Sequence, residues 1–497
     1  MKITIKITII TLCIALSISS YAFDLEEKVK RFTLVSGLTV LVVERHASPT
    51  VSLYITHRVG AVDERDDQSG TAHFLEHMMF KGTKTIGTRN YREEKRIIAK
   101  IDVVAETIRR ESGKNSDSDK EKIEKLRRDL ETLQKKEKQF IVESEIDRLY
   151  TGGGAVDLNA STGYDLTAYH VNLPSNLIEL WARIESDRMR NPVFREFYSE
   201  RNVIMEERKQ SIESNPERRL TELFLGTAFM VHPYRRPVIG WKENIPRLNK
   251  KLMREFFETF YAPSNTVISV VGDVDTEELR NIIERYFSSI PSKAIIEEPV
   301  PSEPPQEGER RAELIDDDAN PKLVIGYHKP TLPSHDDYVF DVIDGILSQG
   351  RTSRLYAKLV KETEIASEVT TVNGFPGARY PNLFVIFATP RHPHTNAEVE
   401  DAIYEELKKM KEEEVSLEEL EKVKNIIKAD YIRRLRTNPG LASMLAYFEA
   451  TAGNYRYITS FLEVLETITP ADIKAVSRKY LVRTNRTVAE IITGEDK

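Results

Sequence analysis

One stretch of the sequence guides the interpretation of the rest, and it reads Gly70-Thr71-Ala72-His73-Phe74-Leu75-Glu76-His77-Met78-Met79-Phe80-Lys81-Gly82. Its apolar residues are typical of a buried helix, which Ser69 or Gly70 can begin and Gly82 can end. A step of four residues returns a side chain to the same helical face, so His73 and His77 can converge on one point. Two imidazoles at one point suit a metal ion.

The spacing H-x-x-E-H is the reverse of a common zinc-peptidase signature, and its chemistry follows from its residue types. Imidazole is a good zinc ligand, and catalytic zinc sites usually combine three protein ligands with a water that becomes easier to deprotonate. Glu76 lies where a general base for that water belongs. The simpler alternative is that two core histidines fell into this spacing by accident.

Residues 1–22 have the pattern of a secretory signal peptide. Lys2 and Lys6 precede an apolar run at 7–18, and Ser20-Tyr21-Ala22 provides a small-x-small cleavage site. We therefore predict an exported protein, periplasmic in a bacterium, with secretion as the alternative. An uncleaved anchor is the other alternative; no later stretch is apolar enough to span, so we expect no stable membrane span after cleavage.

Cysteine usage and charge exclude several classes of protein. The single cysteine, Cys13, lies in the signal segment, so the mature chain would have no disulfide and no thiol or redox catalysis. A chain of this length can bury large cores without disulfides. The formal charge of −7 becomes −9 when Lys2 and Lys6 leave with a segment that holds no acid. A negative chain is a poor match for nucleic acid, and we predict no such partner.

A Pro- and Glu-rich run divides the chain of 497 residues into two parts. We interpret residues 293–312 as a linker between an N-terminal catalytic domain at 23–292 and a C-terminal domain at 313–497. Two pairs of segments are similar across the divide: Tyr261 to Val271 with Tyr480 to Ile492, and Phe194 to Ile212 with Ser416 to Arg434. The sequence thus predicts an α+β fold of two related domains, each an antiparallel-rich sheet with helices packed on one face. Only the first keeps the metal motif.

A highly charged region at about 91–149 separates the metal motif from the next strands. Its apolar residues recur at helical spacing, with a break at 112–118. We predict an inserted helical hairpin with coiled-coil character in the first domain. A solvated structural arm is favoured over a docking arm.

A second acidic segment, Glu200 to Glu207, can complete the metal site. Glu200 and Glu207 are seven residues apart and share one helical face, so either could reach a metal. Glu206 points roughly 100° away and is expected at the surface. Four other histidines show no metal-like spacing and are expected to be structural or at the surface: His170, His232, His328 and His335. Arg235 and Arg236 are expected to be solvated.

Several motifs in order resemble the pitrilysin, or insulinase-type (M16), metallopeptidases over essentially the whole mature chain. They are His73 to His77 with the trailing Phe80 to Thr83, then Asn159-Ala160-Ser161, then Glu200 to Glu207, and finally Leu347 to Leu355. The resemblance implies that His73, His77 and Glu207 bind one zinc ion per chain and that Glu76 activates the water. It also implies that Glu200 supports the site and that Asn159, Ala160 and Ser161 form the sheet edge that binds a peptide substrate as an added strand.

The family encloses its active site between two halves, and this chain resembles one half, the zinc-bearing subunit of the mitochondrial-processing-peptidase-beta-like (M16B-like) type. Self-sufficient members carry an Arg and, seven residues later, a Tyr that reach the substrate. Those positions align with Val360 and Ser367 here. The resemblance therefore implies a heterodimer whose second subunit supplies Arg and Tyr, since a homodimer would lack both.

Three functions remain open from the sequence. The first is an exported zinc endopeptidase that hydrolyses small unfolded peptides or protein fragments. The second is a non-peptidase binding or assembly subunit that retains a metal site, although a structural zinc is normally closed by four ligands, often Cys. The third is a maturation peptidase with one dedicated substrate, which shares the chemistry of the first.

Overall fold

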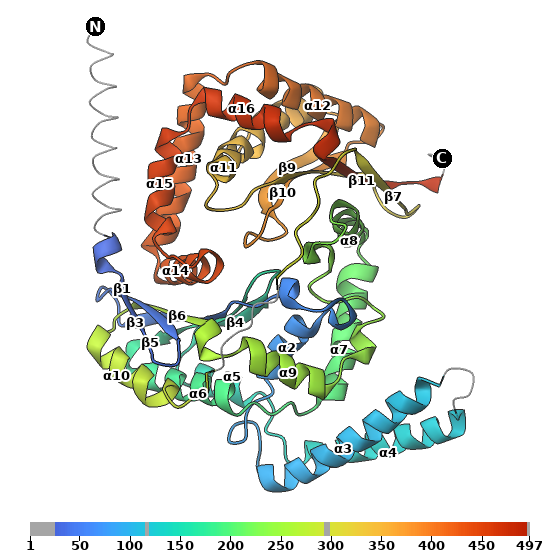
Figure 1. The fold of residues 1–497 in the computed structure, drawn as a ribbon, viewed down its shortest axis with the longest axis vertical. Helices are drawn as coiled ribbons and strands as arrows, with labels where there is room; N and C mark the ends of the chain where they lie inside the picture. Colours follow the sequence, from blue (N-terminus) through green and yellow to red (C-terminus); the bar gives the residue numbers. More distant parts are fainter. Residues whose placement is uncertain (1–24, 115–118, 293–298, 495–497) are drawn as a thin grey trace.

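The structure is a computed structural model that describes residues 25–114, 119–292 and 299–494. Two β-sheets, each packed against helices, lie one above the other, and a helical hairpin projects from the lower one (Figure 1). The predicted signal segment, residues 1–22, lies outside the described residues. Within the described ranges, no helix is both long enough and apolar enough to cross a membrane.

The first sheet has six strands in the order β1-β2-β6-β3-β5-β4. Its strand β6 is buried along its whole length and pairs with β2 in parallel and with β3 antiparallel. The other pairs are antiparallel, as predicted. The strands are β1 (Lys30–Thr33), β2 (Thr39–Glu44), β3 (Thr50–His57), β4 (Val156–Thr162), β5 (Thr167–Pro174) and β6 (Thr266–Gly272).

The second sheet repeats this arrangement with five strands in the order β7-β11-β8-β10-β9. Its β11 pairs with β7 in parallel and with β8 antiparallel, as β6 does in the first sheet. Asn265 donates to the carbonyls of Arg58 and Phe260, and Asn485 donates in the same way to those of His328 and Tyr480. The prediction of two related domains is therefore confirmed. The strands are β7 (Arg310–Ile315), β8 (Lys322–Lys329), β9 (Ala366–Phe375), β10 (Asn382–Pro390) and β11 (Arg486–Ile492).

Each sheet has helices of its own domain on one face. Buried residues of α6 (Ile178–Arg190) and α10 (Thr276–Phe287) share a core with the first sheet. The second sheet packs against α11 (His335–Ser348), α12 (Asn396–Glu412) and α16 (Pro470–Tyr480), supported by α13 (Leu417–Arg436) and α15 (Tyr457–Thr467). These faces agree with the predicted layers.

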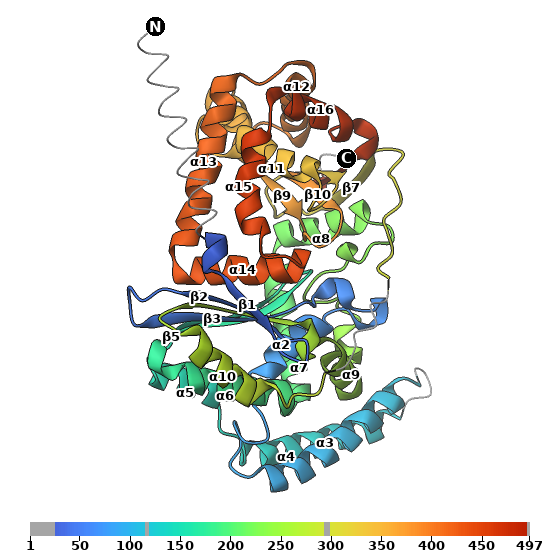
Figure 2. The ribbon, with the colours of Figure 1, turned by 60° about the vertical axis from the view of Figure 1, so that its left-hand side comes forward.

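The opposite face of each sheet is covered by a helix from the other domain. Apolar residues of α14 (Asn438–Ala452) pack on β2 and β6, and those of α8 (Pro216–Ala228) pack on β8, β10 and β11. Two views show α14 against the first sheet and α8 against the second (Figure 2). The prediction of helices on one face is thus correct for each domain's own helices, and the exchanged pair buries the other face of the central strands. This exchange explains why neither side of β6 is exposed to solvent.

The hairpin consists of α3 (Tyr91–Ser112) and α4 (Lys120–Lys138), which lie side by side. A separate helix, α5 (Glu145–Gly152), follows and packs on the first core through Ile146 and Tyr150, so the region predicted as hairpin to about 149 includes the start of α5.

The predicted linker at 293–312 also overlaps a strand, because β7 begins at Arg310. The linker is held to the first domain by Glu303, whose carboxylate accepts hydrogen bonds from the three backbone N–H groups of residues 230–232. The domain boundaries themselves stay predictions.

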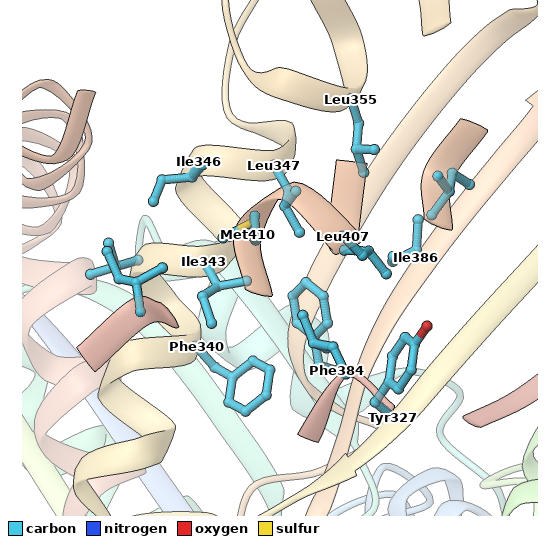
Figure 3. Packing of buried hydrophobic residues seen from close by; sticks show 14 of the residues in the cluster. Tyr327, Phe340, Ile343, Ile346, Leu347, Leu355, Phe384, Ile386, Leu407 and Met410 are labelled. Atoms are coloured by element: carbon cyan, nitrogen blue, oxygen red, sulfur yellow. The ribbon is translucent and has the colours of Figure 1, made fainter. Parts of the chain in front are cut away.

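Helix α11 has an apolar face and an acidic face. Phe340, Ile343, Ile346 and Leu347 point into the second core (Figure 3). On the other side, Asp341 accepts a 2.8 Å hydrogen bond from Asn373 on β9. Burial, followed by the nearby charge of Asp337, raises the pKa of Asp341 from 3.8 to about 7. Its ionised form therefore costs stability at neutral pH.

The substitution Asp341→Asn should flatten the dependence of stability on pH. Between pH 4 and 7 the folded chain keeps a proton that the unfolded chain releases, so the free energy of unfolding falls as pH rises. The variant removes this loss and keeps an acceptor for Asn373. Melting temperatures at pH 5 and pH 8 should differ less for the variant than for the unchanged chain, whereas the exposed control Asp129→Asn should behave like the unchanged chain. Equal differences in all three proteins would contradict the assignment.

Candidate metal centre

The motif helix α2 (Thr71–Met79) is fixed at its start by a buried carboxylate. Gly70 is its N-cap, as predicted, with a φ of 93°, and a Cβ there would lie 2.7 Å from the carbonyl oxygen of Ile239. Glu64 accepts hydrogen bonds from the backbone N–H groups of Gly70 and Ala72, at 2.9 and 2.7 Å. The helix ends at Met79, before Gly82. Glu64 thus takes the role of a capping side chain and sets the start of the helix that carries both histidines.

Three side chains from two helices meet at one point. His73 and His77 come from α2, and Glu207 comes from α7 (Phe197–Arg208). Nε2 of His73 and Nε2 of His77 each lie 3.6 Å from an oxygen of Glu207. One ligand atom from each of the three residues can be chosen so that all lie within 4.8 Å of one another. The neighbouring Glu206 is exposed, as predicted.

This geometry fits a zinc ion. Ligand atoms about 2.0 to 2.2 Å from a tetrahedral ion lie about 3.3 to 3.6 Å apart. Each imidazole reaches that distance from a different oxygen of Glu207, His73 from Oε1 and His77 from Oε2. Burial, followed by the charge of His77, lowers the pKa of His73 to about 4, so its imidazole is neutral and has a lone pair to give. Two imidazoles and one carboxylate form the donor set of a catalytic zinc centre, which keeps a fourth position for water or substrate.

Glu200 contacts the ring nitrogen of His77 that does not face Glu207. His77 Nδ1 lies 2.9 Å from Glu200 Oε1, and Lys81 Nζ lies 2.6 Å from Glu200 Oε2. Burial alone would raise the pKa of Glu200, but the hydrogen bonds from His77 and Lys81 lower it to about 2. The ionised carboxylate keeps the proton of His77 on Nδ1, which leaves Nε2 free to face Glu207.

Glu76 lies beside the substrate edge proposed from the sequence. Thr162, the last residue of β4, donates a 2.6 Å hydrogen bond to Glu76 Oε2. Burial raises the pKa of Glu76, which favours its use as a proton acceptor, while the Thr162 hydrogen bond acts in the opposite direction. Asn159, Ala160 and Ser161 lie on β4, one of the two edge strands of the first sheet, which among the described strands pairs only with β5.

The residues that the sequence analysis placed outside the metal site do lie outside it, but one expectation about them was wrong. Arg236 was expected to be solvated, but it is buried and pairs with Asp66 at 2.6 Å. Val360 lies on the helical segment Tyr356–Glu362 and packs on the second core, and Ser367 lies on β9. His170 stacks on Tyr54, and neither it nor His232, His328 or His335 joins a metal-type cluster in the described part of the chain.

Two family models match the chain. The model of the insulinase peptidases, family M16, matches residues 39–100, and the model described as the peptidase M16 inactive domain matches residues 247–427. The first match contains the metal motif. The second lies mostly in the part of the chain that lacks the motif.

Known proteins are similar to the chain over nearly its full length. The zinc protease PqqE of Helicobacter pylori is 26% identical over 486 residues, which are 96% of this chain and 95% of that protein. The crystal structure of a protease from Helicobacter pylori has a TM-score of 0.78 at 23% identity and covers 94% of this chain and 99% of that one. The periplasmic protease PqqL from Escherichia coli has a TM-score of 0.70 at 18% identity, with 95% of this chain but 48% of that chain covered. The two structures support the fold alone.

Replacing Glu207 should weaken zinc binding far more than replacing its neighbour. In Glu207→Gln the ligand charge is lost, and we expect zinc affinity to fall by about 100-fold or more, since even outer partners contribute about 10- to 100-fold. Glu206→Gln makes the same chemical change one residue away, on the exposed face, and should leave affinity unchanged. Competition with a chromophoric chelator measures both. Similar affinities for the two variants would contradict the assignment of Glu207.

Proposed function

The chain belongs to the insulinase family of peptidases, family M16, and on that premise we propose that it is an exported zinc-dependent endopeptidase that hydrolyses small unfolded peptides or protein fragments. The observation that carries this proposal is the convergence of His73, His77 and Glu207 beside Glu76, a carboxylate that accepts a hydrogen bond from Thr162 and can act as a base. The similarity to proteins named zinc proteases supports it.

The residues divide the chemistry among them. His73, His77 and Glu207 would hold one zinc ion, which makes a water easier to deprotonate and polarises the scissile carbonyl. Glu76 accepts the proton of the attacking water and then returns it to the leaving amine. Thr162 orients Glu76, and Glu200 orients His77.

The substrate would bind as an extended strand along β4. The outer edge of β4 carries Asn159, Ala160 and Ser161 and leads to Thr162, which contacts Glu76. An added strand forms main-chain hydrogen bonds that depend on extension more than on side-chain identity. This binding mode favours short or unfolded peptides. Whether the enzyme degrades many peptides or matures one dedicated substrate would depend on pockets that bind the substrate's side chains.

A second M16-like half would complete the enzyme. Val360 and Ser367 stand at the positions where self-sufficient members carry Arg and Tyr, and neither side chain can donate as those do. The chain also corresponds to about half of PqqL, covering 48% of it. We propose a half-size subunit of the M16B-like type in a heterodimer whose other subunit supplies Arg and Tyr; a homodimer would lack them.

An exported location fits the N-terminal sequence. Lys2 and Lys6 followed by an apolar run and a small-x-small site support a cleaved signal peptide. A structural neighbour, PqqL, is described as periplasmic. We propose the periplasm, with secretion as the alternative.

A non-peptidase assembly subunit is the second candidate. The match to an inactive-domain model favours it, but that match covers residues 247–427 and leaves out the residues that hold the metal and the base. A site with three protein ligands keeps the fourth position that catalysis needs and that structural zinc sites lack.

The substitution Glu76→Gln should separate catalysis from metal binding. The amide cannot accept the proton of water, so we expect the hydrolysis rate to fall by about 10²- to 10⁴-fold, with zinc still bound. Cleavage of a quenched fluorescent peptide library, together with metal analysis, measures both quantities. Retained hydrolysis in the variant would contradict the role of Glu76, and zinc binding without hydrolysis by any form of the chain would favour the assembly subunit.

The need for a second half makes a separate prediction. The purified mature chain alone should hydrolyse the same library slowly or not at all, and addition of an M16-like subunit that carries Arg and Tyr should raise the rate by at least about tenfold, since each group contributes to the transition state. The same subunit with Arg and Tyr replaced by Ala is the matched control. Full activity of the chain alone, lost in Glu76→Gln, would contradict the heterodimer.

A further inference from the structure

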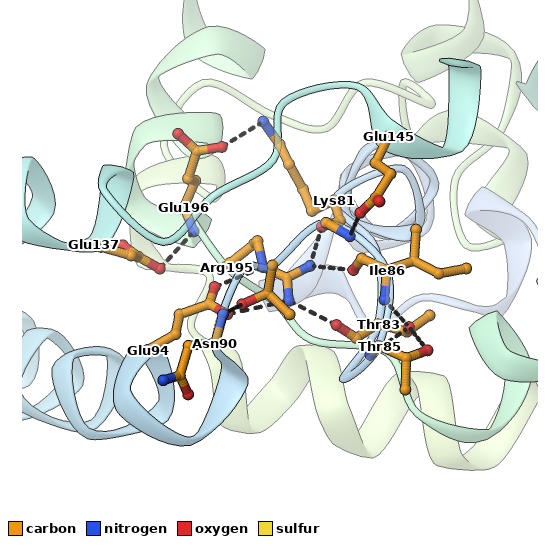
Figure 4. A network of polar contacts seen from close by, with 12 residues as sticks. Lys81, Thr83, Thr85, Ile86, Asn90, Glu94, Glu137, Glu145, Arg195 and Glu196 are labelled. Carbon is orange, nitrogen blue, oxygen red and sulfur yellow. Dashed lines mark hydrogen bonds and ion pairs between the residues drawn. The ribbon is translucent and has the colours of Figure 1, made fainter. Parts of the chain in front are cut away.

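A fully buried arginine joins the base of the hairpin to the metal centre. Arg195 lies just before α7 and is fully buried. Figure 4 shows its guanidinium pointing toward Glu94, Thr83 and Ile86. Nε of Arg195 donates a 2.7 Å hydrogen bond to Glu94 on α3, which is equally buried. Neither residue forms part of the metal site, and no catalytic step uses them.

The same guanidinium holds the loop that follows α2. It donates to the carbonyl oxygens of Lys81, Thr83 and Ile86, with Nη2 lying 2.7 Å from Thr83 and Nη1 lying 3.2 Å from Ile86. The planar fork of arginine can bridge a carboxylate and several carbonyls at once, which a lysine cannot do. Arg195 therefore fixes the backbone of Lys81 relative to α3.

Lys81 connects this loop to His77 through Glu200. Its ammonium lies 2.6 Å from Glu200 and 3.4 Å from Glu196, which are one turn apart at the start of α7. Glu200 in turn holds Nδ1 of His77 at 2.9 Å. A continuous set of charge-assisted contacts thus runs from Glu94 on the hairpin to a zinc-binding imidazole.

The second helix of the hairpin holds α7 directly. Glu137, which is buried on α4, accepts a hydrogen bond from the backbone N–H of Glu196, the N-cap of α7. Gln134 donates to Ser199, and Asp102 on α3 pairs with Lys250 at the start of α9 (Lys250–Phe260). Both hairpin helices therefore contact the elements that carry or flank Glu200.

We propose that the base of the hairpin is a positioning element of the metal centre, with Arg195 and Glu137 as the positioning residues that fix Lys81, Glu200 and His77. This inference rests on the proposed function, because it concerns how the zinc site is held. A buried ion pair is weak evidence for stability, since apolar replacements are often as stable. Its placement between the hairpin and the loop after α2 indicates a geometric role instead.

The far end of the hairpin has no such role. Arg109 forms an exposed, bidentate pair with Glu106 on the same helix, at 2.7 and 2.8 Å. It contacts neither α2 nor α7 through a hydrogen bond or ion pair in the described residues. Arg109→Lys is therefore a matched control for Arg195→Lys, because both replace by lysine an arginine that pairs with both oxygens of a glutamate on α3.

Zinc affinity of the full mature chain, measured by chelator competition well below the melting temperature, tests the proposal. Arg195→Lys keeps the charge opposite Glu94 but loses the fork, and we expect about a tenfold fall in zinc affinity, at the low end of the effect of losing a direct partner of a metal ligand, because Arg195 acts through Lys81 and Glu200. Arg109→Lys should stay within about twofold of the unchanged chain. The visible absorption spectrum of the cobalt-substituted protein should change in Arg195→Lys and not in the control, because it reports ligand geometry.

A second variant keeps the test decisive if Arg195→Lys does not fold. Glu137→Ala removes one hydrogen bond to the N-cap of α7, and zinc affinity should fall by about threefold or more. A lower melting temperature with unchanged zinc affinity and an unchanged cobalt spectrum, in whichever of the two variants folds, would overturn the proposal and make the contacts purely structural. Failure of the unchanged chain to bind zinc is a different result, and it would overturn the proposed function as well.

Discussion

The packing of α2 against α7 is the constraint on which the site depends. Two candidate ligands come from α2 and the third from α7, so the site exists only if the helices keep one separation and one rotation. Phe74 on α2 packs on Phe197 on α7 with ring centroids 4.7 Å apart, and Ile204 is buried behind them. Glu64 fixes the start of α2, and the Glu200–Lys81 pair ties the end of α2 to α7. Apolar contacts set the distance, and the charged contacts set the rotation.

The exchange of helices between domains supplies the rigid frame for this packing. Because α14 covers β2 and β6 and α8 covers β8, β10 and β11, the central strands of each sheet are buried on both faces, and neither domain's core is complete without the other. Helix α8 follows α7 closely in the chain, so the helix that carries Glu207 leads directly into the contact with the second sheet. The domain without the metal motif thus helps to place a metal ligand.

Much of this arrangement could be predicted from local patterns. The spacing of His73, Glu76 and His77 is a property of one helix, and the shared face of Glu200 and Glu207 is a property of another. The two-domain repeat was visible in matching segments, and the matched hydrogen bonds of Asn265 and Asn485 confirm it. Apart from the meeting of Glu207 with the two histidines, which the family resemblance implied, contacts between distant segments could not be predicted, because no local pattern encodes them. Glu64, the carboxylate that caps α2, and Arg195, which meets Glu94 across 101 positions, are such cases.

The central claim is that His73, His77 and Glu207 together bind one zinc ion and leave a position open for chemistry. Anomalous diffraction at the zinc absorption edge, from crystals of the mature chain grown with zinc, tests it most directly. We expect one strong peak about 2.0 to 2.2 Å from Nε2 of both histidines and from a carboxylate oxygen of Glu207, with a non-protein oxygen as the fourth ligand. A zinc ion closed by four protein ligands, or bound at other residues while these three stay apart, would contradict it.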